Sequence, residues 1–300
     1  MSRIGFIGLG MMGAPMAHLL HQAGHPLVVR DAREQAERDF IDGHAGASPG
    51  RDARAFSACD AVITMLPNSS IVDQVVTELA PHLRPGACLI EMSSADPGRT
   101  RVLAGMLAER GVNLVDAPVS GGVKRAVTGS LAIMVGGDAA VVEQWRPLLA
   151  VLGNAITHVG PVGAGHALKA LNNYVSAAAL IATAEAIHVG AAFGIEPATV
   201  VDVINASTGK NNTTENKAHQ FMLNGAFNSG FSLLLQAKDV AIAAKLGPSL
   251  GLPMALAQQI AAITSAASAA LGATADHTEL YRYVGERAPQ ARVAVACMVR

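Results

Sequence analysis

The beginning of the chain carries the pattern that most limits its fold. Arg3 to Gly8 reads as a short apolar strand, and it leads at once into the loop Gly8-Leu9-Gly10-Met11-Met12-Gly13. The pattern then predicts a helix from Ala14 to Gly24, with glycine as its stop. A strand that passes through such a loop directly into a helix is the start of a β-α-β unit. The sequence therefore predicts an α/β protein built on a parallel sheet.

The three glycines of this loop have different expected roles. Gly8 permits a tight turn, Gly10 lets a pyrophosphate approach the backbone, and Gly13 lets helix and strand pack closely. The helix N-terminus would then hold the anionic pyrophosphate. The alternative, a strand-turn-helix without a ligand, is weakened by the next strand of the chain. This second strand, Leu27 to Arg30, ends in Asp31, where an acid can bind the ribose hydroxyls of a dinucleotide.

Asp31 favours NAD over NADP, because a carboxylate repels the additional phosphate of NADP. Arg30 and Arg33 flank it, and a guanidinium can bind a phosphate through two parallel hydrogen bonds. The alternative is that both arginines are solvated surface charges. We therefore expect NAD, with NADP possible.

The alternation of strand and helix patterns continues through the first half of the chain. A helix pattern runs from Pro97 to about Arg110 and another from about Ala139 to Leu152. Further strands are expected at Ala61–Met65, Ala87–Glu91, Asn113–Ala117, Ser130–Val135 and Ala155–Val159. These patterns predict a doubly wound Rossmann sheet, and we place this NAD(P)-binding domain at residues 1–162.

From residue 163 onward the patterns are helical, so we predict an all-helical domain at residues 163–300. One uninterrupted helix is expected from about Gly165 to Phe193, and it would join the two domains. Lys169 and Asn173 share a face of this helix, because they are four residues apart. The positive end of the helix dipole should lower the pKa of Lys169, which suits proton transfer at an alcohol or carbonyl. The alternative is a surface lysine and asparagine.

The rest of the second half is also expected to be mainly helical. Pro197 suits the first position of a short helix, Ala198 to Ala206. The polar segment Ser207–Glu215 is predicted to be a loop. A helix should end near Gly247, and an alanine-rich helix should run from Pro253 to Ala270. Its small residues allow close helix contacts, which supports a homo-oligomer.

Composition excludes several classes of protein. The formal net charge is -1, so charge gives no case for nucleic acid or a membrane surface. The chain has 3 cysteines, Cys59, Cys88 and Cys297, without the spacing of a zinc site or a disulfide scaffold, which fits a reducing cytoplasm. The start lacks the layout of a signal peptide. The apolar window Val175–Ala192 contains polar residues and is expected to be a buried helix. No metal-ligand spacing links His158, His166, His188 and His219.

Taken together, these motifs resemble the β-hydroxyacid dehydrogenase family, which includes the 3-hydroxyisobutyrate dehydrogenases and shares its architecture with 6-phosphogluconate dehydrogenase. The resemblance covers nearly the whole chain. It rests on the opening Phe6–Met16, on Met65-Leu66-Pro67, on Asp116–Gly122, and on Lys169 with Asn173. It implies a Rossmann domain followed by a helical domain for substrate binding and oligomerisation.

The resemblance implies a role for each matched residue. Lys169 falls on the catalytic lysine and Asn173 on the asparagine that orients the substrate, while Ser120, Gly121 and Gly122 match the substrate-carboxylate loop. Consecutive N–H groups after a serine suit a carboxylate, although an ordinary turn is the alternative. The expected cofactor contacts are Gly8, Leu9, Gly10, Met11, Met12, Gly13, Asp31, Met65, Leu66, Pro67, Ser94, Phe231 and Lys238. For Lys238, a surface pair with Asp239 is the alternative.

The implied activity is the reversible NAD-dependent oxidation of a short 3-hydroxy carboxylic acid to its semialdehyde. Lys169 would act as general acid and base. The expected partner is this small acid, not nucleic acid or membrane, and the enzyme is expected to be a homodimer or homotetramer. An NADP(H)-dependent reductase of glyoxylate, tartronate or succinate semialdehyde is an alternative.

The other rivals fit these residues less well. A non-catalytic dinucleotide-binding module should lack Lys169 or Ser120, and imine reductases of this fold usually replace the lysine. A 6-phosphogluconate dehydrogenase has a much longer chain. Two departures from the family pattern stand out: Glu91 replaces a more common aspartate, and Thr208–Asn216 is polar where an aromatic is expected. A polar wall would suit a substrate with more hydroxyls, such as glycerate or a longer sugar acid.

Overall fold

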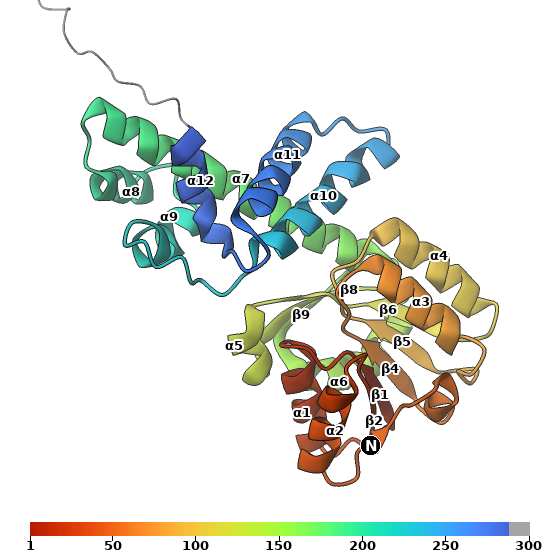
Figure 1. Cartoon of the computed structure of the whole chain (residues 1–300). Helices are drawn as coiled ribbons and strands as arrows, with labels where there is room; N and C mark the ends of the chain where they lie inside the picture. The colour runs from red at the N-terminus through yellow and green to blue at the C-terminus, as the bar shows by residue number, and fades with distance from the viewer. Residues whose placement is uncertain (288–300) are drawn as a thin grey trace, which may run out of the picture. The chain divides into compact units, whose positions relative to one another are not determined.

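The computed structural model describes residues 1–287, so Cys297 and the other residues after 287 lie outside the described part of the chain. The chain divides into two compact units, Met1–Ala170 and a second one that begins at Leu171. Figure 1 shows the sheet in the first unit and only helices in the second. The predicted fold class, a Rossmann domain joined by a long helix to a helical domain, is confirmed. The predicted domain boundary after residue 162 stays a prediction.

One sheet contains all nine strands of the described residues, in the order β3-β2-β1-β4-β5-β6-β8-β7, with β9 paired to β8. Neighbouring strands from β3 to β6 are parallel, and β8 runs antiparallel to β6 and β7. The strands are β1 (Ile4–Ile7), β2 (Leu27–Arg30), β3 (Ser48–Pro49), β4 (Ala61–Thr64), β5 (Cys88–Glu91), β6 (Asn113–Asp116), β7 (Val119–Ser120), β8 (Leu131–Gly136) and β9 (Gly153–Gly160).

Helices cover both faces of this sheet. Those of the first unit are α1 (Gly13–Gln22), α2 (Glu34–Gly43), α3 (Ser69–Leu79), α4 (Pro97–Ala108), α5 (Gly122–Val127) and α6 (Ala139–Leu152), with a 3-10 turn, η1, at Ala53–Phe56. The central strands β1, β4 and β5 are mainly apolar and are buried at every residue, as expected for a parallel sheet with two covered faces.

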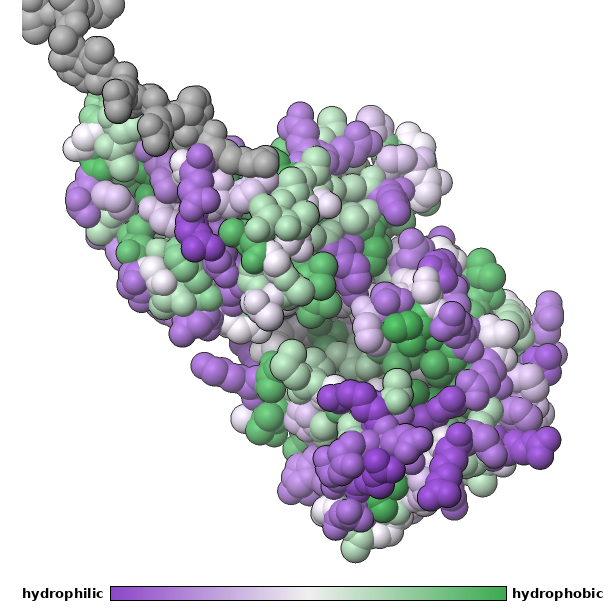
Figure 2. All heavy atoms as spheres, viewed as in Figure 1, coloured by the Kyte–Doolittle hydropathy of each residue, from purple (hydrophilic) through white to green (hydrophobic). Residues whose placement is uncertain are grey.

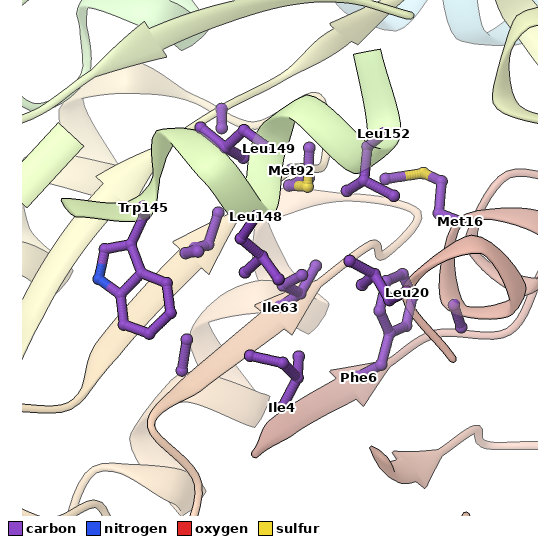
Figure 3. Close-up of a cluster of buried hydrophobic side chains, with 14 of the residues drawn as sticks. Ile4, Phe6, Met16, Leu20, Ile63, Met92, Trp145, Leu148, Leu149 and Leu152 are labelled. Atoms are coloured by element: carbon purple, nitrogen blue, oxygen red, sulfur yellow. The ribbon is translucent and has the colours of Figure 1, made fainter. Parts of the chain in front are cut away.

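Alternate residues of the strands point to opposite faces of the sheet and belong to two separate hydrophobic clusters. On one face, Ile4, Phe6 and Ile63 meet Leu20 of α1 and Trp145 of α6 (Figure 3). On the other face, residues such as Val62 and Leu89 pack against α3 and α4. Each cluster is continuous across several strands, so the carboxyl ends of the parallel strands are held on a rigid base.

The second unit is built around α7 (Ala164–Phe193), a helix of 30 residues and thus about 45 Å long. It is long and apolar enough to cross a membrane by length and composition. In the structure it supplies Ala177, Leu180 and Ile181 to the core of the second unit, as a core helix does. The remaining elements are α8 (Pro197–Asn205), α9 (Asn212–Asn216), η2 (Ala218–Met222), α10 (Leu233–Ser249), α11 (Ala255–Leu271), η3 (His277–Glu279) and α12 (Leu280–Arg287).

The polar segment Ser207–Glu215 differs from its prediction as a loop. It becomes helical at Asn212, because Asn211 caps the first turn of α9. The Asn211 side chain accepts hydrogen bonds from the backbone N–H groups of Thr213 and Thr214, and the Thr214 hydroxyl accepts one from the Asn211 N–H. This capping box supplies partners for backbone groups that a helix end otherwise leaves unpaired.

Candidate active site

The glycine loop between β1 and α1 is tightly packed at two glycines and open at the third. Gly8 has a φ of 104°, and a Cβ there would overlap the carbonyl oxygen of Met65. A Cβ on Gly13 would overlap the Gly8 carbonyl oxygen, whereas a Cβ on Gly10 would meet nothing within 4 Å. In the described residues no side chain caps the start of α1. The open position therefore lies beside backbone N–H groups that can receive an anion.

Asp31, at the end of β2, braces this loop. Its carboxylate accepts hydrogen bonds from the backbone N–H of Leu9 at 2.7 Å and from that of Arg33 at 2.9 Å. The Arg33 guanidinium stays 69% exposed beside Asp31, whereas Arg30 forms a two-bond ion pair with Glu78. The acid expected to contact the ribose is thus oriented, and only Arg33 of the two neighbouring arginines is available to a phosphate.

These residues fit a dinucleotide. The strand order reverses between β1 and β4, and in open α/β sheets ligands bind at such a point, outside the carboxyl ends of the strands. Gly8 follows β1, and Met65, Leu66 and Pro67 follow β4. The Leu66 N–H donates to the Ser93 hydroxyl at 2.8 Å, which ties this segment to the one carrying Ser94 after β5. The predicted cofactor residues of the first unit therefore lie along one edge of the sheet.

The predicted carboxylate loop begins at the end of a short strand. Ser120 closes β7, which pairs with β8 through Ala132, and it is half-buried. Gly121 and Gly122 are exposed and have positive φ values of 130° and 67°. Side chains disfavour this backbone conformation, so the Gly-Gly pair is needed to turn the chain from β7 into α5.

The start of α7 is held against the sheet by one carboxylate. Asp116, at the end of β6, accepts hydrogen bonds from the N–H of Gly163 at 2.7 Å and from the N–H of His166 at 2.9 Å. A Cβ on Gly165 would overlap the Met134 carbonyl oxygen of β8, so the helix approaches the sheet at a distance only glycine allows. The position of Lys169, one turn beyond His166, is thereby fixed to the sheet.

His166 lies at the centre of a buried polar network, and its hydrogen bonds show its charge state. Nε2 is 3.1 Å from the Ser93 carbonyl oxygen, and Nδ1 is 2.8 Å from the Thr100 hydroxyl. That hydroxyl donates to the Asp96 carbonyl oxygen at 3.0 Å, so it accepts from Nδ1. Both ring nitrogens therefore donate, and His166 is a protonated imidazolium.

Two carboxylates balance this charge. Oε2 of Glu91 is 2.7 Å from Nε2, and Oδ2 of Asp116 is 3.8 Å from Nδ1. The Nε2 hydrogen points toward Ser93, so the attraction to Glu91 is mainly Coulombic. Burial opposes both charges. It is outweighed for His166, whose pKa is raised by Glu91 and Asp116, and for Glu91, whose pKa is lowered by His166 and Ser93.

Lys169 and Asn173 are both buried on α7, at 8% and 6% exposure. The Asn173 amide nitrogen donates to Oδ2 of Asp239 at 2.6 Å, and its oxygen accepts from Asn172 at 3.1 Å. An amide nitrogen has two hydrogens, so one remains for a ligand. Asp239 thus orients Asn173, a role that the sequence analysis did not assign.

Asp239 also lies 3.5 Å from the ammonium of Lys238. The Asp239 side chain is only 3% exposed, so Lys238 pairs with a buried carboxylate, and its expected contact with the cofactor stays a prediction. Phe231 precedes α10, and its ring meets that of His277 edge to face, with 5.4 Å between the centroids. Within the second unit, Asn173, Lys238 and Asp239 therefore form one connected group.

The structure thus groups the predicted residues within each unit. The glycine loop, Asp31, Met65–Pro67, Ser94, Ser120–Gly122 and Lys169 belong to the first unit, and Asn173, Phe231 and Lys238 to the second. Sequence reasoning missed Glu91 and His166 as partners. The one feature of the sequence that could have indicated this pairing was Glu91, which stands where an aspartate is more common in the family. Residues 1–287 contain no group of three or more His, Cys, Asp or Glu side chains that could hold a metal.

Comparison with known proteins agrees with this geometry. The family model for the NAD binding domain of 6-phosphogluconate dehydrogenase matches residues 3–160, and the model for the NAD-binding of NADP-dependent 3-hydroxyisobutyrate dehydrogenase matches residues 163–284. Fold, site and matches define an NAD(P)-dependent dehydrogenase that acts on a hydroxy acid, with NAD as cofactor and NADP possible. The predicted enzyme class and cofactor are thereby confirmed.

The relatives identify the family. The chain is 38% identical over 264 residues to 2-(hydroxymethyl)glutarate dehydrogenase of Eubacterium barkeri, covering 86% of this chain and 87% of the relative. It is 40% identical over 253 residues to the NAD-dependent L-serine dehydrogenase of Pseudomonas aeruginosa, covering 81% and 84%. A Mycobacterium tuberculosis 3-hydroxyisobutyrate dehydrogenase structure with L-serine superposes with a TM-score of 0.89, at 32% identity over 95% of this chain and 99% of that one. The chain belongs to the β-hydroxyacid dehydrogenase family.

Proposed function

We propose that this enzyme catalyses the reversible NAD-dependent oxidation of a short 3-hydroxy carboxylic acid to its semialdehyde, with Lys169 as general acid and base. The observation that carries the proposal is the pair of buried polar side chains on one face of α7, Lys169 and Asn173. Lys169 lies one turn before Asn173 on the same face of the helix. Asn173 is held by Asp239 and keeps one donor for a ligand.

Bound NAD would accept a hydride, and the residues of the chain would supply binding and proton transfer. The fit of the loop at Gly10 and of Asp31 to a dinucleotide supports this. Ser120, Gly121 and Gly122 would bind the carboxylate of the substrate. The remaining Asn173 donor would orient the hydroxyl. Neutral Lys169 would take the hydroxyl proton during oxidation and return it during reduction.

Lys169→Ala tests the role of the lysine. General acid–base catalysis contributes about 10²–10⁴-fold, so turnover should fall by that range while NADH still binds. Lys245→Ala is the matched control, because Lys245 is exposed on α10. Turnover by Lys169→Ala equal to that of the control would remove Lys169 from the mechanism.

A substrate panel tests the reaction itself. Initial rates of NADH or NADPH formation would be measured with 3-hydroxyisobutyrate, 3-hydroxypropionate, glycerate, threonate and serine. We expect turnover with NAD in the oxidative direction. The competing function is an NADP(H)-dependent reductase of glyoxylate, tartronate or succinate semialdehyde, which the exposed Arg33 favours. Activity only with these aldehydes and NADPH would establish that alternative.

We also propose that the enzyme is a cytoplasmic homodimer or homotetramer. A groove of ≈ 530 Å³ between α7 and α11 is lined mainly by apolar residues, among them the exposed Val175 and Leu256. Figure 2 shows the pale apolar surface of alanine-rich α11. Light scattering with size-exclusion chromatography gives the test: a Leu256→Glu variant should dissociate, and a monomeric wild type would contradict the proposal.

A further inference from the structure

Lys217 is a half-buried lysine in the second unit that the proposed mechanism does not use. It lies between α9 and η2, and its ammonium donates to the Ser176 hydroxyl of α7 at 3.4 Å. Within residues 1–287, no carboxylate oxygen lies within 4.0 Å of this ammonium. By contrast, the exposed Lys210 nearby forms an ion pair with Glu215 at 2.8 Å. Burial lowers the pKa of Lys217, so the protein bears a cost for holding this charge.

The nearest acidic group does not offset this cost through direct contact. Asp276 favours the charged form of Lys217 from a distance, but its carboxylate is already occupied. It accepts hydrogen bonds from Ser229, from the backbone of Gly230, and from both the backbone and the hydroxyl of Thr278. A carboxylate has about four lone-pair sites, so these donors leave little capacity for Lys217.

A buried histidine beside Lys217 lacks a partner on one nitrogen. His277 is 3% exposed, and its Nδ1 lies 3.1 Å from the carbonyl oxygen of Phe231, so Nδ1 carries the hydrogen. Burial, with a further contribution from the charge of Lys217, lowers the pKa of His277 to about 4, so the ring is neutral. Its Nε2 has no hydrogen-bond partner among the described residues. A buried acceptor without a donor is a position that a ligand hydroxyl or protonated group can occupy.

The location of Lys217 connects it to the proposed substrate. Lys169, Asn173 and Ser176 follow one another along one face of α7, because they are spaced by four and three residues. Ser176, which holds the Lys217 ammonium, is therefore about 4.5 Å along the helix from Asn173. A substrate oriented by Asn173 can extend along this face to Lys217 if it continues beyond its reacting carbon.

We propose that Lys217 binds a second carboxylate of the substrate, so that the preferred substrates are 3-hydroxy acids with another carboxylate a few carbons from the carbinol. This inference rests on the proposed function and makes it more specific. An incoming carboxylate would accept hydrogen bonds from the ammonium and neutralise its charge. Monocarboxylic acids would leave Lys217 without a counter-charge.

Kinetics with matched acids tests the proposal. The wild type should have a higher kcat/KM for 2-(hydroxymethyl)glutarate than for 3-hydroxyisobutyrate. Lys217→Met removes the charge at similar volume, and loss of a charged hydrogen bond should lower kcat/KM for the diacid roughly ten- to hundredfold, mainly through KM. The monoacid should change less than about twofold, since it makes no such bond. Lys210→Met is the control variant, and Lys217→Arg should recover most of the diacid activity.

Binding of glutarate keeps this test independent of turnover. Glutarate has two carboxylates and no carbinol, so its Kd can be measured by calorimetry even if no acid of the panel is oxidised. The wild type and Lys210→Met should bind it at least about tenfold more tightly than Lys217→Met. Equal binding by all three proteins, or an equal loss of diacid and monoacid activity in Lys217→Met, would overturn the inference. If no acid is oxidised but glutarate still binds as expected, the result would count against the proposed function alone.

Discussion

Replacing His166 should destabilise the first unit strongly. The His166 side chain is 0% exposed and lies between two buried carboxylates, Glu91 and Asp116. His166→Ala would leave both without their counter-charge, and breaking a buried ion pair in this way costs about 3–5 kcal/mol. At roughly 2–4 °C per kcal/mol for a domain of this size, the melting temperature should fall by roughly 6–20 °C.

The same network predicts how stability depends on pH. The folded-state pKa of His166 is raised, so its contribution is fully present below the unfolded value of about 6.5 and is lost as pH rises through the folded value. The pKa of Glu91 is lowered, so its contribution is present above about 4.3 and is lost as pH falls through the folded value. The network should therefore stabilise the protein most between about pH 4.3 and 6.5.

Tryptophan fluorescence can follow this unit selectively. The chain has 1 tryptophan, Trp145, and it is buried in α6 within the first unit. Urea unfolding from pH 5 to 9 should show the wild type losing stability above neutral pH, while His166→Gln loses much less. His219→Gln is the matched control, because His219 pairs with Asp202 at the surface of the second unit and should contribute at most about 1 kcal/mol.

A double-mutant cycle measures how much the interaction between Glu91 and His166 contributes to the free energy of unfolding. Glu91→Gln with His166→Gln should be less destabilised than the sum of the single variants, because it buries no unpaired charge. If His166→Gln kept the stability and the pH profile of the wild type, the imidazolium would be refuted.

Local geometry supports three further predictions. Gly13→Ala should disrupt folding, because its Cβ would overlap the Gly8 carbonyl oxygen. Gly10→Ala should keep the wild-type melting temperature but weaken NADH binding, which fluorescence titration would measure. Equal melting temperatures of the two variants would contradict this prediction. Asp31→Asn should raise the ratio of NADP to NAD kcat/KM at least about tenfold, since one negative charge beside the phosphate is lost, and an unchanged ratio would place that phosphate elsewhere. Asn211→Ala removes the cap of α9 and should lower the free energy of urea unfolding by about 1 kcal/mol. An unchanged free energy of unfolding would show that the cap does not stabilise the protein.

Most of the fold could be predicted because its signals are local. The apolar strands, the glycine loop and the long helix each depend on residues close together in the chain, and α6 runs from Ala139 to Leu152 as predicted. The sequence analysis did not identify β3 and β7, since each has two residues and too few positions to show a period. The helix α9 was taken for a loop because its composition is polar, although Asn211 and Thr214 formed a recognisable cap.

The supporting contacts of the site were less accessible to sequence reasoning. Asp116 and His166 are 50 residues apart, and Asn173 and Asp239 are 66 apart, so no spacing rule joins them. The sequence analysis expected the helix dipole to lower the pKa of Lys169, which assumes that no charged side chain lies at the start of α7. The structure places the Asp116 carboxylate on it, with Glu91 and His166 close by. The local field at Lys169 therefore depends on residues from three separate segments.

The anchoring of α7 by Asp116 has a consequence for protein engineering. A segment that carries the proposed catalytic lysine could be chosen as a unit to exchange between related enzymes. Here, however, the helix start fits only a sheet that offers a carboxylate to Gly163 and His166 and leaves room for Gly165 against β8. A chimera that receives residues 163–169 without Asp116 and Glu91 would acquire an unmatched cation in its interior. Recombination designs should therefore transfer these two acids together with the helix.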